Sequence, residues 1–439
     1  MARIEPADFR RRLNRTNELP LLYAVMAFQF ISMFLLAFRD GAVNDFSLLM
    51  SMLLPAGTYI TLKITQKIWP IDRAIFILAA FLCSLSVVIL RAVFTKTANA
   101  SDQAKYLLVG YAALIFGAGF IRSIRSWDTL TLLVMPLCLI FLVTPFFFTN
   151  STAKNWIRLG GIQLQPSELM KPVMTVILAA GFTSNRGWKR ILIYIAFAAA
   201  ACGILLVERD LGAMFLYFVL ALSMFYAGTG KGRLTLAVVV LSAGALLLVM
   251  SNIDWIAARI PVFKYAADRI AIWKNPWNSA YENARQIMQG LISIASGGLF
   301  GSGLGLGSAH RVAVVASDYI FAAICEELGL GFAVAVLAAY LVMFLRSITI
   351  AMNARQRFHA LVVFGCTVEI TAQMLLIVCG NVHLLPLTGV TLPFVSEGGS
   401  SLVACMAQTG MILGVSAINA QDEYDDLCRI NGGAWRDEE

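Results

Sequence analysis

Long apolar stretches follow one another along almost the whole chain, with short polar segments between them. A helix needs about 20 apolar residues to cross a bilayer. Stretches of this kind begin near Leu19, Leu48, Ile71, Tyr106, Thr129, Pro166, Arg190, Asp210, Leu234, Tyr319, Ala360 and Ser400. The pattern predicts an all-α fold, a polytopic integral membrane bundle of about 12 transmembrane helices.

Composition supports a membrane protein and excludes several other classes. Of the 439 residues, 59% are hydrophobic and only 14% are charged, with a mean hydropathy of +0.76, whereas about 25% of the residues of a soluble domain are charged. The net charge of +8 comes mainly from basic residues in short gaps between apolar stretches, which indicates membrane topology and not nucleic-acid binding. The eight cysteines form no CxxC pair and the three histidines are scattered, so neither a zinc site nor a disulfide framework is predicted.

The distribution of basic residues predicts how the chain is oriented. Lys and Arg occupy alternate gaps, beginning with the arginines of the N-terminal segment, and such gaps face the cytoplasm. An even number of helices then places both termini in the cytoplasm. We therefore expect a multi-pass protein of the cytoplasmic membrane with an N-terminal segment (1–18), one transmembrane domain (19–418) and a solvated acidic tail (419–439).

The longest polar interruption, residues 253–317, lies between the ninth and tenth predicted helices and is expected to face outward. It holds too many Trp, Ile and Phe residues for a disordered loop, and residues 281–296 have a helical pattern, so we expect a folded extracellular cap. Its stretch GSGLGLG (301–307) lacks the Lys-Ser/Thr pair of a phosphate-binding loop, which excludes a nucleotide site.

Unusual polar residues gather on the same, outward side of the predicted bundle. In NWIRLGGIQLQPSELMK (155–171), Pro166 suits the first turn of a helix, and Glu168 and Lys171 follow three residues apart on one helix face. Two interpretations remain, and both can hold at once. The pair is a salt bridge that lets both charges enter the membrane together, or it is a polar floor beneath a substrate groove.

Two further polar clusters share this orientation. For Glu208-Arg209-Asp210 we expect a turn with mutual charge pairing. Residues 381–401 are apolar but punctuated by prolines and glycines, and they are too few for two spans. Because non-helical backbone at membrane depth needs protein or a water-filled cavity around it, this segment predicts a re-entrant hairpin that lines a cavity.

Three acids lie in or beside the apolar segment ASDYIFAAICEELG (316–329). Asp318 lies at the water–lipid boundary, where it could cap the next helix or act as a base or metal ligand in a groove. Glu326 and Glu327 are about 100° apart on a helix and cannot share a face. At least one of them is expected to pack into the bundle against a cation or a backbone donor.

These motifs, in this order, resemble the SEDS family (shape, elongation, division and sporulation), which includes the RodA and FtsW proteins. The resemblance covers about residues 72–415 and leaves extra N-terminal helices at about 19–68. It rests on QPSE with its following Lys, DLG, NPW, the Gln286-x-x-Gln289 pair with SGG-x-x-G, SDYIF with EELG, and PLTG-x-x-LPF-x-S-x-GGSS. Any one of these motifs is weak evidence, whereas the whole series is specific.

The resemblance implies a peptidoglycan glycosyltransferase that polymerises lipid II outside the membrane, for cell elongation, division or sporulation. It implies that Asp318 is the catalytic residue, because the aspartate that the family requires maps onto it. The family's Glu and Lys after QPSE map onto Glu168 and Lys171, and its Arg before NPW maps onto Arg269. Further candidate substrate contacts are Gln286, Gln289, Lys154, Trp156 and Ser400.

The resemblance also implies the partners. These are lipid II, a class B penicillin-binding protein acting as transpeptidase, and membrane lipids. The diphosphate of lipid II needs cations, for which Arg269, Lys274, Arg285 and Lys154 are candidates. A divalent cation such as Mg2+ or Mn2+ could share that task, and no other cofactor is expected.

The chain departs from the family pattern at several positions, which leaves the details of substrate contact open; these positions include Asn155, Glu208, Arg209 and Glu397. Two other functions stay open as well. A lipid II flippase, or another transporter of lipid-linked substrates, would need polar residues through the depth of the bilayer, and Glu369 and Gln373 are suitable. A catalytically silent scaffold is the other, and the presence of Asp318, Glu168 and Lys171 argues against it.

Overall fold

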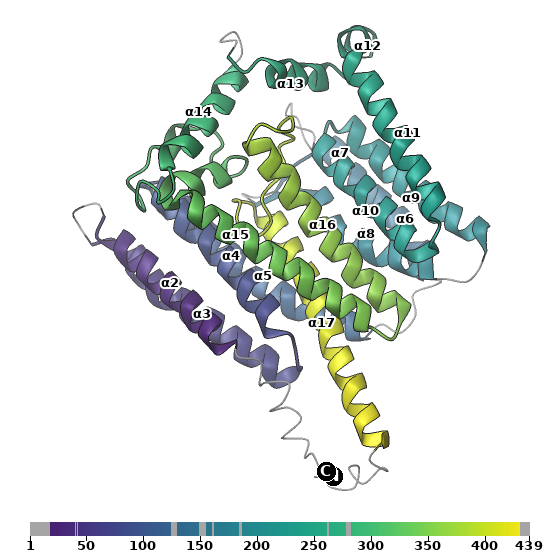
Figure 1. Cartoon of the computed structure of the whole chain (residues 1–439), viewed down its shortest axis with the longest axis horizontal. Helices are drawn as coiled ribbons and strands as arrows, with labels where there is room; N and C mark the ends of the chain where they lie inside the picture. The colour runs from purple at the N-terminus through teal and green to yellow at the C-terminus, as the bar shows by residue number, and fades with distance from the viewer. Residues whose placement is uncertain are drawn as a thin grey trace.

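The computed structural model describes residues 18–39, 41, 43–123, 130–148, 155–159, 162–183, 187–260, 263–277 and 282–430. Within these residues the molecule is a bundle of long helices with a group of shorter helices across one end (Figure 1). The two strands described, β1 (Ile157–Leu159) and β2 (Ile162–Leu164), form one small antiparallel hairpin. The predicted all-α class is confirmed.

Eleven helical segments of the described chain are long and apolar enough to cross a membrane, so the chain is a multi-pass membrane protein. They are α2 (Leu19–Ala37), α3 (Asp45–Ile68), α4 (Arg73–Val93), α5 (Ala98–Ser123), α6 with α7 (Leu130–Val143 and Pro145–Phe148), α9 (Trp188–Val207), α10 (Leu211–Thr229), α11 (Gly232–Ser251), α15 (Ile320–Asn353), α16 (Arg357–Asn381) and α17 (Gly399–Ile430). The remaining predicted stretch forms α8 (Pro166–Thr183), whose composition leaves it outside this set. α8 is an interior helix, mostly buried against α10, α16 and α17.

The centre of the bundle depends on close packing of small residues. α4 is almost completely buried, and α5 packs along α17. A side chain at Gly117 on α5 would meet the backbone oxygen of Ala407 at 2.4 Å, and one at Gly410 on α17 would meet that of Leu114 at 2.1 Å. Glycine at these two positions therefore lets the helix backbones touch, as is common between membrane helices.

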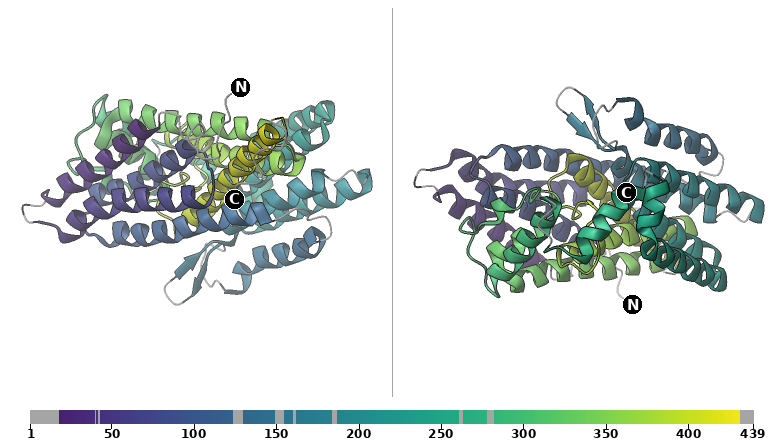
Figure 2. Two further views of the ribbon diagram at one scale, coloured as in Figure 1. Left: turned by 90° about the horizontal axis from the view of Figure 1, so that it is seen from below. Right: turned by 90° about the horizontal axis from the view of Figure 1, so that it is seen from above.

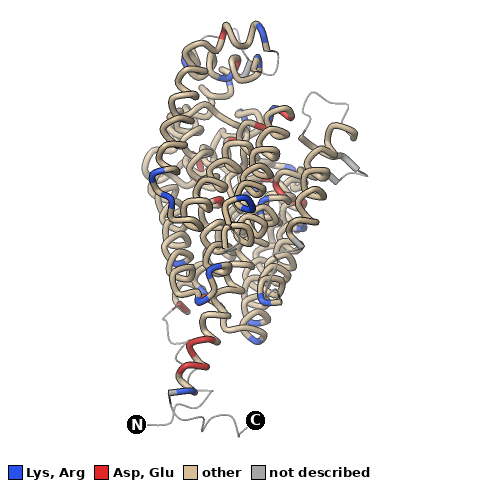
Figure 3. Tube along the Cα trace, turned by 90° about the vertical axis from the view of Figure 1, so that its right-hand side faces the viewer, with Lys and Arg blue, Asp and Glu red and all other residues tan. Residues whose placement is uncertain are grey.

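The two ends of the bundle differ. The cap end carries α12 (Ile253–Arg259), α13 (Lys264–Lys274), α14 (Glu282–Gly297) and the 3₁₀ helix η2 (Ala309–Arg311), all from the long interruption between α11 and α15 (Figures 1 and 2). The tail end carries the last turns of α17, where acidic residues gather (Figure 3). α14 forms where the sequence predicts a helix at 281–296.

Candidate active site

Asp318 lies at the cap end, immediately before α15. The N-cap residue of α15 is Tyr319, and no side chain caps that helix, so the interpretation of Asp318 as a helix cap is wrong. The backbone of Asp318 is held on both sides. Its N–H donates to Val314 O at 3.0 Å, and its carbonyl accepts from Asn381 Nδ2 at 2.7 Å. Asn381 ends α16, so the end of one long helix and the turn before α15 together fix the backbone of the candidate base.

The segment between α16 and α17, residues 382–398, is bonded directly to the chain before Asp318. It is largely non-helical, as the punctuated sequence predicts. Ser396 Oγ donates to Ser317 O and accepts from Leu392 N at 2.8 Å. The N–H of Glu397 donates to Ala316 O at 2.8 Å. This segment, called the hairpin segment below, therefore forms one wall beside Asp318.

Gly389 of the hairpin segment marks the point where Asp318 and Arg269 converge. A side chain at this position would begin 3.4 Å from Arg269 Nη2 and 3.7 Å from Asp318 Oδ2. Gly389 has a φ of +74°, a conformation that glycine adopts without strain. A carboxylate and a guanidinium thus face the same small space, which lacks a side chain of its own.

Arg269 is presented by the cap helix α13, which is attached to the hairpin segment. The guanidinium donates to Leu387 O and to Tyr265 OH, and it lies over the Tyr265 ring at 4.5 Å from the centroid. One turn later, Trp273 Nε1 donates to His383 O at 3.3 Å. α13 is therefore docked onto the hairpin segment at two points, and its cation is oriented before any substrate arrives.

The surroundings of Asp318 make its carboxylate more basic. Burial raises the pKa of Asp318 above the ordinary value of an aspartate, because removal from water disfavours the charged form. The Ser317 hydroxyl and the Arg269 charge oppose this rise but do not cancel it. A carboxyl group with a raised pKa accepts a proton more readily, as a general base requires.

Glu168 and Lys171 lie below this point, inside the bundle. Lys171 Nζ contacts Glu168 Oε1 at 2.8 Å, and Lys171 and Glu168 are only 1% and 4% exposed, so the predicted salt bridge is confirmed. Lys171 Nζ also donates to Gln373 Oε1 at 2.6 Å, and Gln373 Nε2 donates to Thr391 O at 2.8 Å. The buried pair on α8 is thus connected through α16 to the hairpin segment, two residues from Gly389.

The first residues of α17 also bond to the network that contains Gln373 and Thr391. Ser401 Oγ lies 2.7 Å from Thr391 Oγ1, and Ser400 Oγ accepts from Gln165 N at 3.1 Å. Deeper in the bundle, Glu369 Oε2 accepts from Gln408 Nε2 at 2.7 Å. The predicted residue Ser400 therefore joins α17 to the residue before α8.

Asp210 gathers several donors next to this network. Its Oδ2 accepts from Asn155 Nδ2 at 3.2 Å and from Gln165 Nε2 at 3.0 Å, and its Oδ1 accepts from Ala213 N at 3.0 Å, which caps α10. Arg209 is exposed, whereas Asp210 is buried. The expected mutual charge pairing in this turn is wrong, because Asp210 bonds to donors from other segments.

Glu208 is buried in the same turn without such donors. It is 4% exposed, and its Oε1 has no hydrogen-bond partner within the described chain. Burial and the nearby Asp210 charge raise the pKa of Glu208 to about 8. The next turn of α10 touches the hairpin segment, since a side chain at Gly212 would meet Val390 Cγ1 at 2.4 Å and Thr388 Cβ at 3.2 Å.

The other predicted substrate contacts are less closely tied to this point. Gln286 and Gln289 are half-buried on α14, and their side chains make no hydrogen bond to another described residue. Their neighbour Gly290 packs against the ring of Tyr319. Trp156 is half-buried beside Asn155. Lys154 lies outside the described residues.

Glu326 and Glu327 hold the glycine-rich loop of the cap. Ser308 donates to Glu326 Oε1 through its N–H at 2.6 Å and through its hydroxyl at 2.9 Å. The N–H of Gly305 donates to Glu327 Oε2 at 2.5 Å. The prediction of a backbone donor is confirmed for both acids. The loop that resembles a nucleotide site therefore binds two carboxylates of its own chain.

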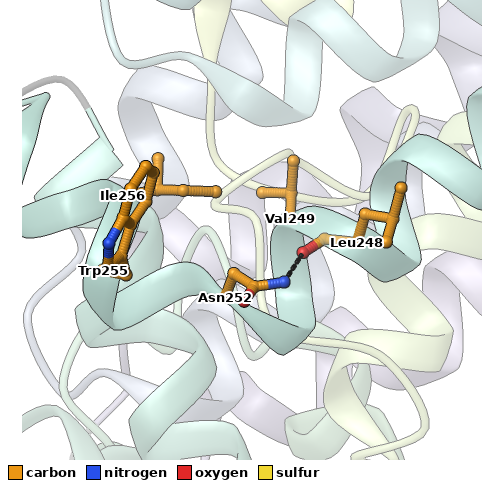
Figure 4. Close-up of a pocket in the computed structure, with 5 residues that line it drawn as sticks. All are labelled: Leu248, Val249, Asn252, Trp255 and Ile256. Atoms are coloured by element: carbon orange, nitrogen blue, oxygen red, sulfur yellow. Dashed lines mark hydrogen bonds between the residues drawn. The ribbon is translucent and has the colours of Figure 1, made fainter.

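Two hollows lie elsewhere and share no residue with this site. One, of about 350 Å³, lies at the bend between α11 and α12 and is lined by Leu248, Val249, Asn252, Trp255 and Ile256 (Figure 4). The other, of about 1090 Å³, lies at the tail end. There Arg346 Nη1 bridges Asp72 Oδ2 and Glu18 Oε1, each at 2.9 Å.

Sequence reasoning missed Asn381, Gln165 and Tyr265, which orient the residues that it named. Gln165 belongs to the QPSE motif, and Asn381 is the first residue of the segment 381–401 that prolines and glycines interrupt. Both residues could therefore have been found from the motifs. Tyr265 lies four residues before Arg269 on one helix face, a spacing that also brings side chains together.

Comparison with known proteins gives consistent matches. The "Cell cycle protein" family FtsW/RodA/SpoVE matches residues 68–421. Peptidoglycan glycosyltransferase RodA of Mycobacterium tuberculosis is 29% identical over 328 residues, covering 70% of this chain and 68% of the relative. The probable peptidoglycan glycosyltransferase FtsW of Pseudomonas fluorescens is 31% identical over 330 residues, covering 70% and 76%.

Solved structures share the fold. A chain from a structure described as a peptidoglycan synthase complex that coordinates polymerization and crosslinking aligns with a TM-score of 0.64 and 23% identity, covering 80% of this chain and 99% of that one. Rod shape determining protein RodA of Thermus thermophilus aligns with a TM-score of 0.54 and 21% identity, covering 79% and 96%. At these identities the likeness supports the arrangement of helices described above.

Proposed function

Because this chain belongs to the FtsW/RodA/SpoVE family, whose relatives above are named peptidoglycan glycosyltransferases, we propose that it joins lipid II molecules into glycan strands at the outer face of the cytoplasmic membrane. In this proposal the cap end faces outward and both termini are cytoplasmic. The observation that carries the proposal is the convergence of Asp318 Oδ2 and Arg269 Nη2 on Gly389. It supplies a base and a cation at one point beside the cap.

The reaction needs one proton acceptor and one site of charge stabilisation. Asp318 accepts the proton of the acceptor's GlcNAc 4-hydroxyl, and that oxygen forms a bond to C1 of the donor's MurNAc. The bond from C1 to the diphosphate breaks, and its electron pair leaves with undecaprenyl diphosphate. Attack opposite the leaving group inverts the α-linkage to β. Arg269 is suited to the negative charge that develops on the diphosphate.

The buried pair Glu168–Lys171 serves the site from below. Lys171 donates to Gln373, which donates to Thr391 O, so the pair is linked to the hairpin segment two residues from Gly389. Binding geometry of this kind matters because a misplacement of about 1 Å can cost a hundredfold in rate. We propose that Glu168 and Lys171 position the hairpin segment. Substrate then contacts the hairpin segment from the cap side.

A resident metal centre has little support from the protein side chains. Within the described residues, no three His, Cys, Asp or Glu side chains lie close enough together to hold a metal ion. Asp318 faces its space with Arg269 and not with a second acid. A Mg2+ or Mn2+ ion that arrives with the diphosphate would need only one or two protein carboxylates, so the divalent cation stays a prediction, and no step of the reaction is assigned to it.

A partner with transpeptidase activity belongs to the proposal. The similar chain of known structure comes from a complex described as coordinating polymerization and crosslinking. We propose that a class B penicillin-binding protein crosslinks the strands that this chain makes, and that membrane lipids surround its apolar helices.

The direct test is polymer formation by the purified protein in detergent. Fluorescently labelled lipid II is incubated with the protein, with and without a co-purified class B penicillin-binding protein, and the products are separated by length on a gel. Glycan strands support the proposal, since detergent micelles have no two sides between which a flippase could move lipid. Absence of strands from both preparations, combined with lipid II translocation in vesicles, would favour a transporter.

A further inference from the structure

The first two helices lie before the region that is shared with the family, which begins at residue 68. α2 and α3 pack against each other and against α4, at the edge of the bundle (Figure 1). Polar bonds fasten them in the apolar region. Gln29 Nε2 donates to Thr58 Oγ1 at 3.0 Å, and Thr58 Oγ1 lies 3.3 Å from Tyr111 OH on α5. The α2–α3 pair is therefore a fixed part of the bundle and not a loose appendage.

Arg39 follows α2 at the cap end and connects the end of α4 with the cap. Its Nη1 donates to Ala92 O at 2.5 Å and to Arg91 O at 3.4 Å. The same side chain lies flat against Gly305, because a side chain there would meet Arg39 Cδ at 2.5 Å and Nε at 2.7 Å. Gly305 also has a φ of +78°, so both its backbone and its contact with Arg39 require glycine.

Gly305 belongs to the glycine-rich loop, residues 298–308, that is wrapped around the first turns of α15. Its N–H bonds to the carboxylate of Glu327, which is 1% exposed, and Arg39 is near enough to Glu327 for a favourable charge interaction. The N–H of Gly303 donates to Glu327 O at 3.0 Å. At this level α15 is interrupted, since Gly329 has φ of 85° and ψ of 165° inside the helix. The loop therefore supports α15 at the place where its own hydrogen bonds are broken.

We propose that the α2–α3 pair is a positioning element for the active site. Arg39 clamps the glycine-rich loop against α15 and so keeps the first turns of α15, with Asp318 directly before them, in one geometry. Arg39 is a positioning residue, because it acts through Gly305 and Glu327. The effect on catalysis rests on the proposed function, whereas the clamp itself is measurable without any activity.

Hydrogen–deuterium exchange of the purified full-length protein tests the clamp. Arg39→Ala should speed amide exchange in residues 302–308 by at least about tenfold, which corresponds to about 1.4 kcal/mol less protection. Thr58→Val is the matched control, because it removes polar bonds of the same helix pair far from the loop, and it should leave exchange in the loop unchanged. Unchanged exchange in Arg39→Ala, or equal loosening in Thr58→Val, would overturn the clamp.

Steady-state polymerisation kinetics test the consequence for catalysis. Arg39→Ala should lower kcat about tenfold and change KM less than twofold, because the clamp orders the base and does not contact substrate. Arg39→Lys, which keeps the charge, should recover part of the loss, and Thr58→Val should match the wild type. A loosened loop with wild-type kcat would overturn the positioning role. Should Arg39→Ala not fold, Gly305→Ala disturbs the same contact from the loop side and is expected to give the same loosening.

A wild-type protein that makes no glycan strands would overturn the proposed function while leaving the exchange experiment decisive for the clamp.

Discussion

Asp318 and Arg269 approach Gly389 from two different elements, with Oδ2 at 3.7 Å and Nη2 at 3.4 Å from the position that a side chain would take. One comes from the chain that leads into α15 and the other from the cap helix α13. Both charged groups therefore face one space beside Gly389 of the hairpin segment. Asp318 could then bind a substrate hydroxyl while Arg269 binds a diphosphate.

The first prediction concerns Gly389 itself. Gly389→Ala should fold but lose at least about tenfold in polymerisation, because a methyl group would fill the space between the two charges and strain a backbone at φ +74°. Strain of this kind costs about 1–3 kcal/mol. Polymer length and yield from labelled lipid II are the measurement.

Gly230→Ala is the control for backbone strain. Gly230 has a φ of +69°, nothing lies within 4 Å of the position that a methyl group would take there, and it ends α10 away from the site. The variant should retain activity near that of the wild type. An equal loss of polymerisation activity in both variants would mean that backbone strain, and not the filling of the space at Gly389, causes the loss.

The second prediction concerns pH. Since a base must be ionised, activity should rise as pH increases through the raised pKa of Asp318. The Arg269 charge lowers that pKa, so Arg269→Gln should move the acidic limb of the kcat/KM profile to higher pH, in addition to reducing the rate. A limb that stays in place would show that Arg269 does not act on the group that titrates.

Motifs and apolar length were enough to predict several features of this fold. The Glu168–Lys171 pair, α14 and the non-helical hairpin segment each depend on residues that are close in sequence. The resemblance to a family also selected Asp318 as the candidate base, and that role stays a prediction. These features are local, so the pattern of one chain contains them.

Other features depend on pairs that only the folded bundle brings together. Lys171 and Gln373 are 202 residues apart, and no spacing in one sequence indicates that bond. Asp210 was expected to pair within its own tripeptide, but Asn155 and Gln165, which precede α8, both donate to its Oδ2. The packing of α8 against α10 and α16 decides both outcomes.

The third prediction tests the buried pair. Lys171→Met should lower stability by about 3–5 kcal/mol, because it leaves the Glu168 carboxylate buried without its cation. The double variant with Glu168→Gln should recover most of that loss, while its polymerisation stays low because the link to Gln373 is gone. The midpoint temperature of unfolding in detergent measures the first effect. Equal midpoints for the single variant and the wild type would rule out a stabilising role for the pair.

The fourth prediction concerns Glu208, whose pKa is raised to about 8 from an ordinary value of 4.5. Between these pH values the folded protein binds more protons than the unfolded chain, so this residue makes stability fall as pH rises. Glu208→Gln removes that dependence. The free energy of unfolding of the variant should therefore increase relative to that of the wild type from pH 5 to pH 8, by a few kcal/mol at most.

Unfolding midpoints across that pH range measure this gain. Glu423→Gln, at an exposed position on α17, is the control and should run parallel to the wild type. A Glu208→Gln curve that also runs parallel would show that Glu208 does not titrate in this window.

Single-turnover polymerisation by purified Asp318→Asn with labelled lipid II is the most direct test of the proposed base. The substitution keeps the size of the side chain and removes the proton acceptor, and circular dichroism and the unfolding midpoint establish that the variant is folded. We predict a folded protein that still binds lipid II but extends glycan strands at a rate at least about a hundredfold below wild type, the lower range for losing a general base. Strands formed at close to the wild-type rate would show that Asp318 does not take the proton.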